Sequence, residues 1–114
     1  MRLEHVVAER SPPSADLNGM AATAKEASAF LKALAHQSRL MILCILCDGE
    51  KSVTELERLL ALRQPTVSQQ LARLRADGLV NARRDGKTIH YSLANDDVRT
   101  IIEAIHGVFC RTHA

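Results

Sequence analysis

The chain has 114 residues, of which 46% are hydrophobic and 3% aromatic, and its formal net charge at pH 7 is +2. This length supports one domain with a single core, and the scarcity of aromatic side chains argues against a base-stacking surface for single-stranded nucleic acid. No apolar run reaches the roughly 20 residues of a membrane span, and the N-terminus lacks the apolar stretch of a signal peptide, so we expect a cytoplasmic protein without a membrane partner.

Positive charge is concentrated in one segment of the chain. Between Arg63 and His90 there are six basic and two acidic residues, which gives this segment a net charge of +4 and leaves −2 for the rest. Such a segment is typical of a surface that binds a polyanion, although a solvated charged hairpin has the same composition. Charge alone therefore leaves both interpretations open.

The N-terminal part of the sequence predicts a tail and two helices. Residues 1–17 contain a Ser-Pro-Pro-Ser stretch and no sustained periodicity, so we expect a mobile tail ahead of a single domain over residues 18–114. From about residue 20 to 35 apolar side chains recur on one face, which predicts an amphipathic helix. A second helix, from about residue 38 to 47, is apolar almost all the way round and should be the buried central one.

The middle of the sequence predicts two more helices separated by a tight turn. Ser52, followed three residues later by Glu55, has the form of a capping box and opens a short third helix. After a turn at residues 61–63, the fourth helix begins at Gln64 and Pro65, because proline is well tolerated at the first helical position. Its predicted buried stripe consists of Val67, Leu71 and Leu74.

A hairpin and a last helix complete the predicted fold. Two β-prone runs, residues 79–84 and 88–93, flank Asp85-Gly86-Lys87, and an Asp-Gly turn between such runs is a strong hairpin signal. A final helix is expected from about residue 96 to 110. The predicted fold class is mainly α with a β-hairpin wing: a winged helix-turn-helix in the order α-α-α-α-β-β-α.

The polar face of the fourth helix and the basic hairpin form the predicted DNA-reading surface. Hydrogen-bonding side chains near the helix start suit base edges and phosphates, and the basic hairpin suits the backbone or the minor groove. An ordinary polar solvent face is the alternative, disfavoured by the combination of helix order, Pro65, wing and charge. The candidate contacts to double-stranded DNA are Gln64, Thr66, Ser68, Gln69, Gln70, Arg73, Arg83, Arg84 and Lys87.

Three motifs in this order resemble the ArsR/SmtB family of bacterial repressors. They are residues 34–40 (LAHQSRL), 64–71 (QPTVSQQL) and 74–80 (LRADGLV), and the later Tyr91-Ser92-Leu93 fits as well; the resemblance covers about residues 20–110. It implies a winged-helix homodimer, paired through its first and last helices, that binds an imperfect palindrome and is released by an inducer. The wide apolar stripe of the last helix independently indicates a partner. The candidate interface residues are Phe30, Leu31, Ile101, Ile102, Ile105 and Phe109.

Known metal sites of that family match this sequence poorly. Residues 53–57 lack the Cys-x-Cys pattern of one site type. The last helix offers Asp96, Asp97, Glu103, His106 and His113 toward another, but Val108 and Arg111 stand where that pattern has ligands. We therefore predict no metal and no cofactor. A repressor that responds to zinc, cadmium or copper through the cysteines and the C-terminal histidines remains the alternative.

The three cysteines, Cys44, Cys47 and Cys110, predict the kind of inducer. Cys44 and Cys47 lie in the last turns of their helix, where the helix dipole opposes a thiolate, so a thioredoxin-type pair is disfavoured. Burial as small apolar residues is the ordinary alternative. The placement of Cys44 and Cys110 resembles the persulfide-responsive branch of the family, which implies that reactive sulfur species convert this pair to a disulfide or polysulfide bridge and derepress sulfide-detoxification genes. For Cys47 the resemblance supplies no partner.

Two other classes of protein are disfavoured by the sequence. A thiol enzyme needs a base and oxyanion donors near its cysteine, and no such polar cluster accompanies any of the three, so we predict that the chain is not an enzyme. A winged helix that only mediates protein contacts is a further alternative, which unaltered mobility of promoter DNA would support.

Overall fold

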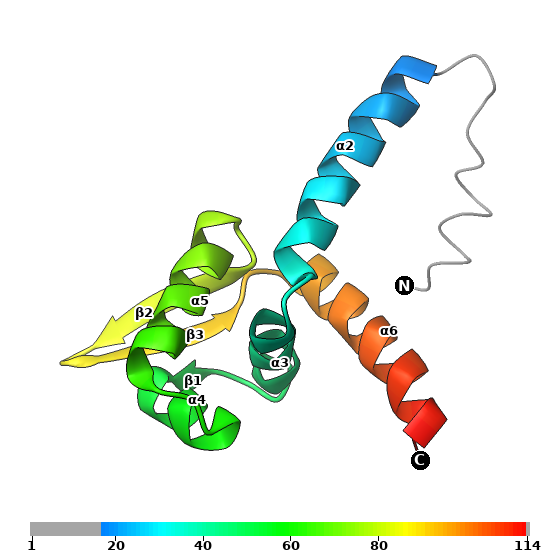
Figure 1. Ribbon diagram of the computed structural model, residues 1–114. Coiled ribbons are helices and arrows are strands. Elements are labelled where there is room, and N and C mark those ends of the chain that lie inside the picture. The colour runs from blue at the N-terminus through cyan, green and yellow to red at the C-terminus, as the bar shows by residue number, and fades with distance from the viewer. Residues whose placement is uncertain (1–16, 114) are drawn as a thin grey trace.

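The structure, a computed structural model, describes the backbone of residues 17–113 and the side chains of residues 17–109. The predicted order of helices and hairpin is confirmed, with one additional short strand (Figure 1). In chain order the elements are α2 (Leu17–Leu34), α3 (Gln37–Leu46), β1 (Lys51–Ser52), α4 (Val53–Leu60), α5 (Gln64–Ala76), β2 (Val80–Asp85), β3 (Thr88–Leu93) and α6 (Asp96–His113).

Helix α3 lies at the centre of the core, as its all-round apolar sequence predicts. It packs against all four of the other helices described and against β3. Ile42, Leu43 and Leu46 are completely or almost completely buried. Burying a side chain of this kind stabilises the fold by about 1.5–3 kcal/mol, so α3 is the element that the others are assembled around.

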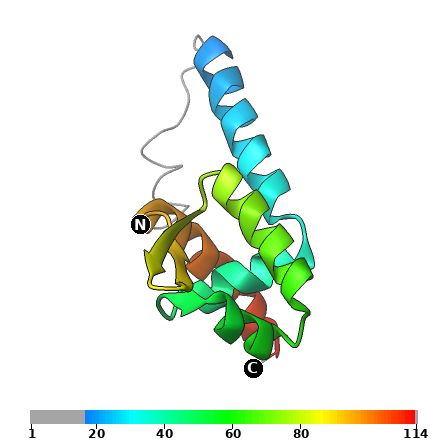
Figure 2. The same ribbon diagram turned by 90° about the vertical axis from the view of Figure 1, so that its left-hand side faces the viewer.

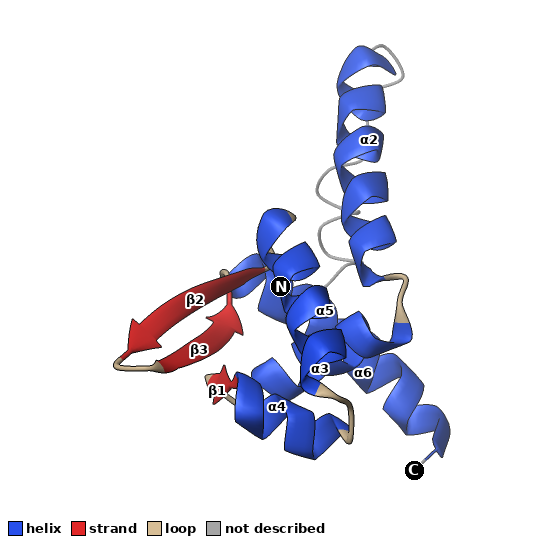
Figure 3. Ribbon diagram, turned by 60° about the vertical axis from the view of Figure 1, so that its left-hand side comes forward, coloured by secondary structure: helices blue, strands red, loops and turns tan. Residues whose placement is uncertain are grey.

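Helices α4 and α5 form the helix-turn-helix, and their ends follow the predicted signals. The Ser52 hydroxyl accepts a hydrogen bond from the Glu55 N–H at 3.2 Å, and the Glu55 carboxylate accepts one from the Ser52 N–H at 2.9 Å, so the capping box is confirmed. The turn begins at Ala61, whose φ of 55° is left-handed. Val67, Leu71 and Leu74 are fully buried and anchor α5 on the core. Figure 3 shows α4 and α5 beside α3.

The wing is an antiparallel hairpin of β2 and β3 that projects from the body of the molecule (Figure 1) and points toward the viewer in Figure 2. Gly86 takes the positive φ of 63° that the tight turn requires. Sequence analysis missed β1, which pairs with β3 through Lys51↔Tyr91 and Ser52↔His90 and completes a sheet of order β1-β3-β2. A strand of two residues has no periodicity to detect, so only the cap at Ser52 was visible in the sequence.

Helices α2 and α6 extend away from the core in different directions (Figure 1). Both are longer than predicted: α2 begins at Leu17 instead of about residue 20, and α6 continues to His113 instead of ending near residue 110. Residues 1–16 of the predicted tail lie outside the described residues, whereas Leu17 belongs to α2. Among the described helices no single one is long and apolar enough to cross a membrane; α2 and α3 reach that length only as a pair bent by 94°.

Candidate DNA-binding face and thiol pocket

Helix α5 presents polar side chains outside the core, from Gln64 in its first turn to Arg73 in its last. Gln64, Gln69 and Arg73 are exposed, and Thr66 and Ser68 are half-buried. Gln64 Nε2 donates a hydrogen bond to Ser68 Oγ at 2.7 Å, and Arg73 Nε is paired with the Asp77 carboxylate at 2.8 Å. No side chain caps the start of this helix, and an uncapped helix N-terminus suits an anionic oxygen such as that of a phosphate.

The wing carries the remaining predicted DNA contacts, and one of them is already paired. Arg83, Arg84 and Lys87 are exposed, but Arg83 makes a two-pronged ion pair with Glu50, at 2.6 and 3.1 Å. The hydrogen bond from Arg83 lowers the pKa of the Glu50 carboxyl, and the same bond raises the pKa of Arg83. Any contact of Arg83 with DNA therefore competes with Glu50.

Gln70 is the predicted DNA contact whose environment differs most from expectation. Its side chain is half-buried, and its Oε1 accepts a hydrogen bond from Arg39 Nη1 at 3.1 Å. One end of its amide is therefore engaged inside the protomer. Sequence reasoning assigned no role to Arg39. The available signal was that it is a single charged residue at the start of an otherwise apolar helix.

An apolar groove of about 400 Å³ lies between α2 and α6. Leu31 and Phe109 in it are 57% and 64% exposed, which is unusual for large apolar side chains unless a partner covers them. Five of the six predicted interface residues line this groove. The full lining is Ala27, Phe30, Leu31, Ile101, Ala104, Ile105, Val108 and Phe109.

Ile102 does not belong to this groove, and its prediction as an interface residue is wrong. It is 0% exposed and packs into the protomer core together with Val98. The last helix carries two apolar stripes, one inward through Val98 and Ile102 and one outward through Ile101 and Ile105. Helical periodicity alone does not separate adjacent stripes, which is why the sequence merged them.

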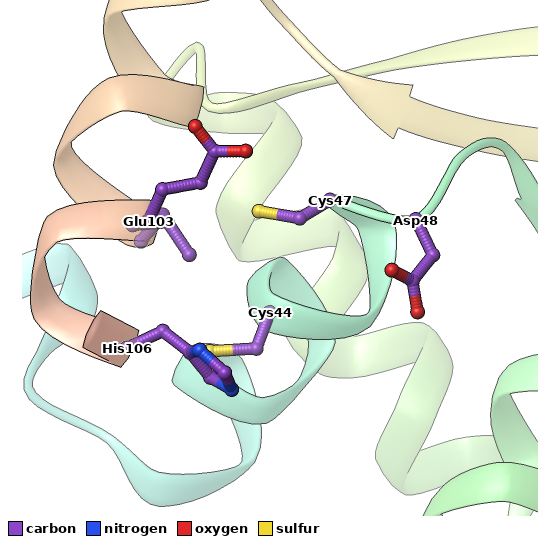
Figure 4. Close-up of a pocket in the computed structure, with 6 residues that line it drawn as sticks. Cys44, Cys47, Asp48, Glu103 and His106 are labelled. Carbon is purple, nitrogen blue, oxygen red and sulfur yellow. The ribbon is translucent and has the colours of Figure 1, made fainter. Parts of the chain in front are cut away.

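A second cavity, of about 370 Å³, lies between the end of α3 and the middle of α6 (Figure 4). Its lining brings together two cysteines, two carboxylates and one imidazole that are far apart in the sequence. The His106 ring lies in front of the Cys44 sulfur in this view, and the Cys47 sulfur extends toward α6. The lining residues are Cys44, Cys47, Asp48, Ile102, Glu103 and His106.

The pocket disfavours a thiolate at Cys47. Burial raises the pKa of this thiol above its ordinary value of 9.0, the Arg99 guanidinium opposes that shift, and Glu103, Cys44 and Asp48 add to it. Arg99 also donates a hydrogen bond of 2.7 Å to the Cys47 carbonyl, which fixes the end of α3 against α6. At neutral pH Cys47 is therefore a protonated thiol.

The structure places the other predicted sulfur and metal ligands along α6. Asp96 and Asp97 lie in its first turn, about 15 Å along the helix axis from His106, so they do not share a site with it. Within residues 17–109, no three His, Cys, Asp or Glu side chains are grouped closely enough to hold a metal ion. Cys110 and His113 belong to α6, but their side chains lie outside the described part.

Comparisons with known proteins agree with this arrangement. Residues 36–82 match the model of the family described as "Bacterial regulatory protein, arsR family". The "Biofilm growth-associated repressor" of Agrobacterium fabrum is 50% identical over 94 residues, which are 82% of this chain and 80% of that protein.

Two solved structures are similar over most of the chain. Reduced HlyU from Vibrio cholerae is 45% identical, with a TM-score of 0.79, over 82% of this chain and 99% of its own. The homodimeric winged helix-turn-helix DNA-binding domain Mb0332 from Mycobacterium bovis, titled a possible ArsR-family regulator, is 30% identical, with a TM-score of 0.74, over 88% of this chain and 93% of its own.

Proposed function

The chain belongs to the ArsR family of bacterial regulatory proteins, and from this premise we propose that it is a repressor whose inducer is a reactive sulfur species. Family membership makes it a DNA-binding transcriptional regulator and not an enzyme, and the homodimeric neighbour supports a dimer of this chain. Its 50% identical relative is named a repressor. The sulfur-dependent release of DNA is the new part of the proposal.

We propose that each protomer of the dimer reads one half of a palindromic operator. The exposed side chains of α5, which are Gln64 and Gln69 in its first half and Arg73 in its last turn, enter the major groove together with Thr66 and Ser68. On the wing, Arg84 and Lys87 contact the phosphate backbone, joined by Arg83 when it leaves Glu50. Half-sites one helical turn apart require the two α5 helices to be about 34 Å apart, so the geometry of the dimer decides the affinity.

The position of Cys44 is the observation that carries the sulfur proposal. Cys44 lies on α3 and lines a pocket whose opposite wall is α6, including His106. Cys110 follows His106 by four residues in the same helix, which is one turn, or about 6 Å along the axis. The Cys110 position therefore follows, by one turn of α6, the residue that lines the pocket together with Cys44.

The chemistry needs a thiolate, and the pocket supplies one group that favours it. Asp48 and Glu103 disfavour a negative charge, as does the C-terminal end of α3, whereas the His106 imidazole is the basic group in the pocket that is able to accept the Cys44 proton. This thiolate attacks the sulfane sulfur of a persulfide, and the donor leaves as a thiolate, so Cys44 becomes a persulfide. Cys110 then attacks the inner sulfur, hydrogen sulfide leaves, and a disulfide remains.

A longer bridge follows from the same chemistry. If a second sulfane sulfur is transferred before Cys110 attacks, the departure of hydrogen sulfide leaves a trisulfide between Cys44 and Cys110. A direct disulfide requires Cα atoms within about 7 Å, and an inserted sulfur relaxes this limit. Sulfane donors are then favoured over simple oxidants, because the longer bridge spans a larger separation of the two Cα atoms. A plain oxidant can form only the short bridge, whatever its strength.

Such a bridge connects the core helix to a helix of the dimer face. Ile105 and Phe109 of α6 line the apolar groove, so a bridge at Cys110 alters the position of residues that face the partner. A small rotation changes the spacing of the two α5 helices and therefore the fit to both half-sites. Reversing a two-state equilibrium from 1:99 to 99:1 takes about 5.5 kcal/mol, which a covalent bond is able to supply.

The first experiment is mass spectrometry of the reduced protein after treatment with glutathione persulfide, with peroxide, oxidised glutathione and zinc as parallel samples. We expect persulfide alone to give a Cys44–Cys110 cross-link that contains added sulfur. Cys47→Ser serves as the matched control and should behave as the unmodified protein, whereas Cys44→Ser should form no bridge. Unmodified thiols beside one retained zinc per protomer would contradict the proposal and support a metal-responsive repressor.

A further inference from the structure

Arg39 is the one charged side chain that is buried among residues 17–109, at 9% exposure. A buried guanidinium is costly unless its N–H groups are hydrogen-bonded. Here Nε donates to the Ala33 carbonyl at 2.6 Å, Nη1 donates to Gln70 Oε1 at 3.1 Å, and Nη2 donates to the Lys32 carbonyl at 3.4 Å. These three acceptors fix the orientation of the guanidinium.

The acceptors belong to two different functional elements. Lys32 and Ala33 lie in the last turn of α2, where backbone carbonyls have no partner within the helix and a cation is favourable. Gln70 lies in α5, beside the buried stripe of that helix. Arg39, in the first turn of α3, therefore joins the helix that carries part of the dimer face to the helix that reads DNA.

Gln70 is poorly placed to read a base. A glutamine that recognises adenine uses its amide oxygen and its amide nitrogen together. The Gln70 oxygen is engaged by Arg39, and the side chain is half-buried while neighbouring Gln69 is exposed. The two adjacent glutamines therefore have different environments: Gln69 faces solvent, and Gln70 is bonded inside the protomer.

We propose that Arg39 and Gln70 are positioning residues for DNA binding, which set the orientation of α5 relative to the dimer helix α2. In a dimer this contact occurs twice, so it helps to determine the distance between the two reading helices and hence the preferred spacing of the half-sites. Gln70 acts through Arg39 and makes no specific contact with a base. The proposal rests on DNA binding and is independent of the sulfur chemistry of Cys44.

The test compares variants on operators of different spacing. The probe is a palindromic duplex selected from random DNA by the unmodified protein, together with versions that have one base pair inserted or removed between the half-sites. For Gln70→Met we expect about tenfold weaker binding to the selected duplex, an unchanged salt dependence because no phosphate contact is lost, and a several-fold smaller discrimination between spacings.

Two further variants distinguish a positioning role of Gln70 from a direct contact of Gln70 with DNA. Gln70→Glu keeps an acceptor for Arg39, so we expect affinity and spacing preference within about threefold of the unmodified protein, whereas a residue at the DNA surface would lose far more with a carboxylate. Gln69→Ala is the matched control, for which we expect relaxed preference at one base-pair position and unchanged spacing preference.

The role of Arg39 is tested by its energetic coupling to Gln70. Arg39→Met removes the side-chain donor to the Ala33 carbonyl and to Gln70 and is expected to lower stability. Its DNA affinity is therefore compared in a double-mutant cycle with Gln70→Met, in which the effects should be strongly non-additive. The proposal is overturned if Gln70→Met keeps the full spacing preference, if it relaxes the choice at a single base pair, or if the two variants are additive.

Discussion

The two ends of α3 differ in how they are packed. At its N-terminal end Arg39 fills its site and makes three hydrogen bonds to neighbouring elements. At its C-terminal end Cys44 and Cys47 border a cavity of about 370 Å³ next to α6. An end held by three hydrogen bonds can transmit a displacement, and an end beside a cavity leaves room for a reagent. One central helix thus borders both the proposed DNA-reading helix and the proposed reactive pocket.

The largest effect on stability is expected from a substitution in the middle of α3, between these two ends. Leu43 is 0% exposed, so Leu43→Ala should lower the free energy of unfolding by about 2–5 kcal/mol through lost burial and the cavity that it leaves. Urea denaturation measures this loss. Met41→Ala, on the exposed side of the same helix at 41% exposure, is the control and should change stability by less than about 1 kcal/mol. Equal losses for both would show that α3 is not the centre of the core.

The next prediction concerns the hydrogen bond between Arg99 of α6 and the C-terminal end of α3, beside the cavity. Arg99→Met removes the hydrogen bond to the Cys47 carbonyl, and we expect a loss of about 1–2 kcal/mol in the free energy of unfolding. Because the Arg99 charge also lowers the Cys47 pKa, its removal should move the alkylation midpoint of Cys47 to higher pH. Lys25→Met on α2 removes a similar charge from an exposed position and should leave both measurements unchanged.

His106 tests how the cavity activates a thiol. In the proposed chemistry it accepts the Cys44 proton, so in His106→Gln the alkylation of Cys44 by iodoacetamide should become about five- to tenfold slower near pH 7 and equal to that of the unmodified protein at high pH. Peptide mapping at timed intervals separates Cys44 from the other cysteines. An unchanged pH profile, matching that of the control His90→Gln, would exclude this role for His106.

The smallest effect is expected at the wing. The Arg83 hydrogen bond lowers the Glu50 pKa below its ordinary value of 4.5, so this pair is fully formed above that pH and is lost as the pH falls through the lowered value. Glu50→Gln should release Arg83 toward DNA, with about twofold tighter binding at neutral pH and a steeper dependence on salt. Glu26→Gln makes the same change of charge on α2, and an equal response from it would show that Arg83 does not reach DNA.

The sequence predicted the elements whose signals are local. The capping box at Ser52, the proline at the start of α5 and the Asp-Gly turn each determine a helix end or a hairpin through neighbouring residues, and all three are confirmed. The boundaries at Leu17 and His113 were missed because hydrophobic periodicity locates the middle of a helix better than its ends.

The candidate sites depended more on contacts between distant residues. The burial of Ile102, the pairing of Arg83 with Glu50 and the bond from Arg39 to Gln70 each join segments that are far apart in the chain or distinguish two faces of one helix. Composition and periodicity contain no record of such contacts. They arise only when the helices and strands are packed together, so the direction of individual side chains could not be predicted from the sequence.

In the proposed mechanism, a sulfur bridge from Cys44 to Cys110 releases DNA. The most direct measurement is the fluorescence anisotropy of a labelled operator bound to the reduced dimer during titration with glutathione persulfide, followed by a thiol reductant. We predict release by persulfide, recovery on reduction, and no release from Cys44→Ser or Cys110→Ser, while Cys47→Ser responds normally. Release from Cys44→Ser, or release by zinc with no response to persulfide, would contradict the account.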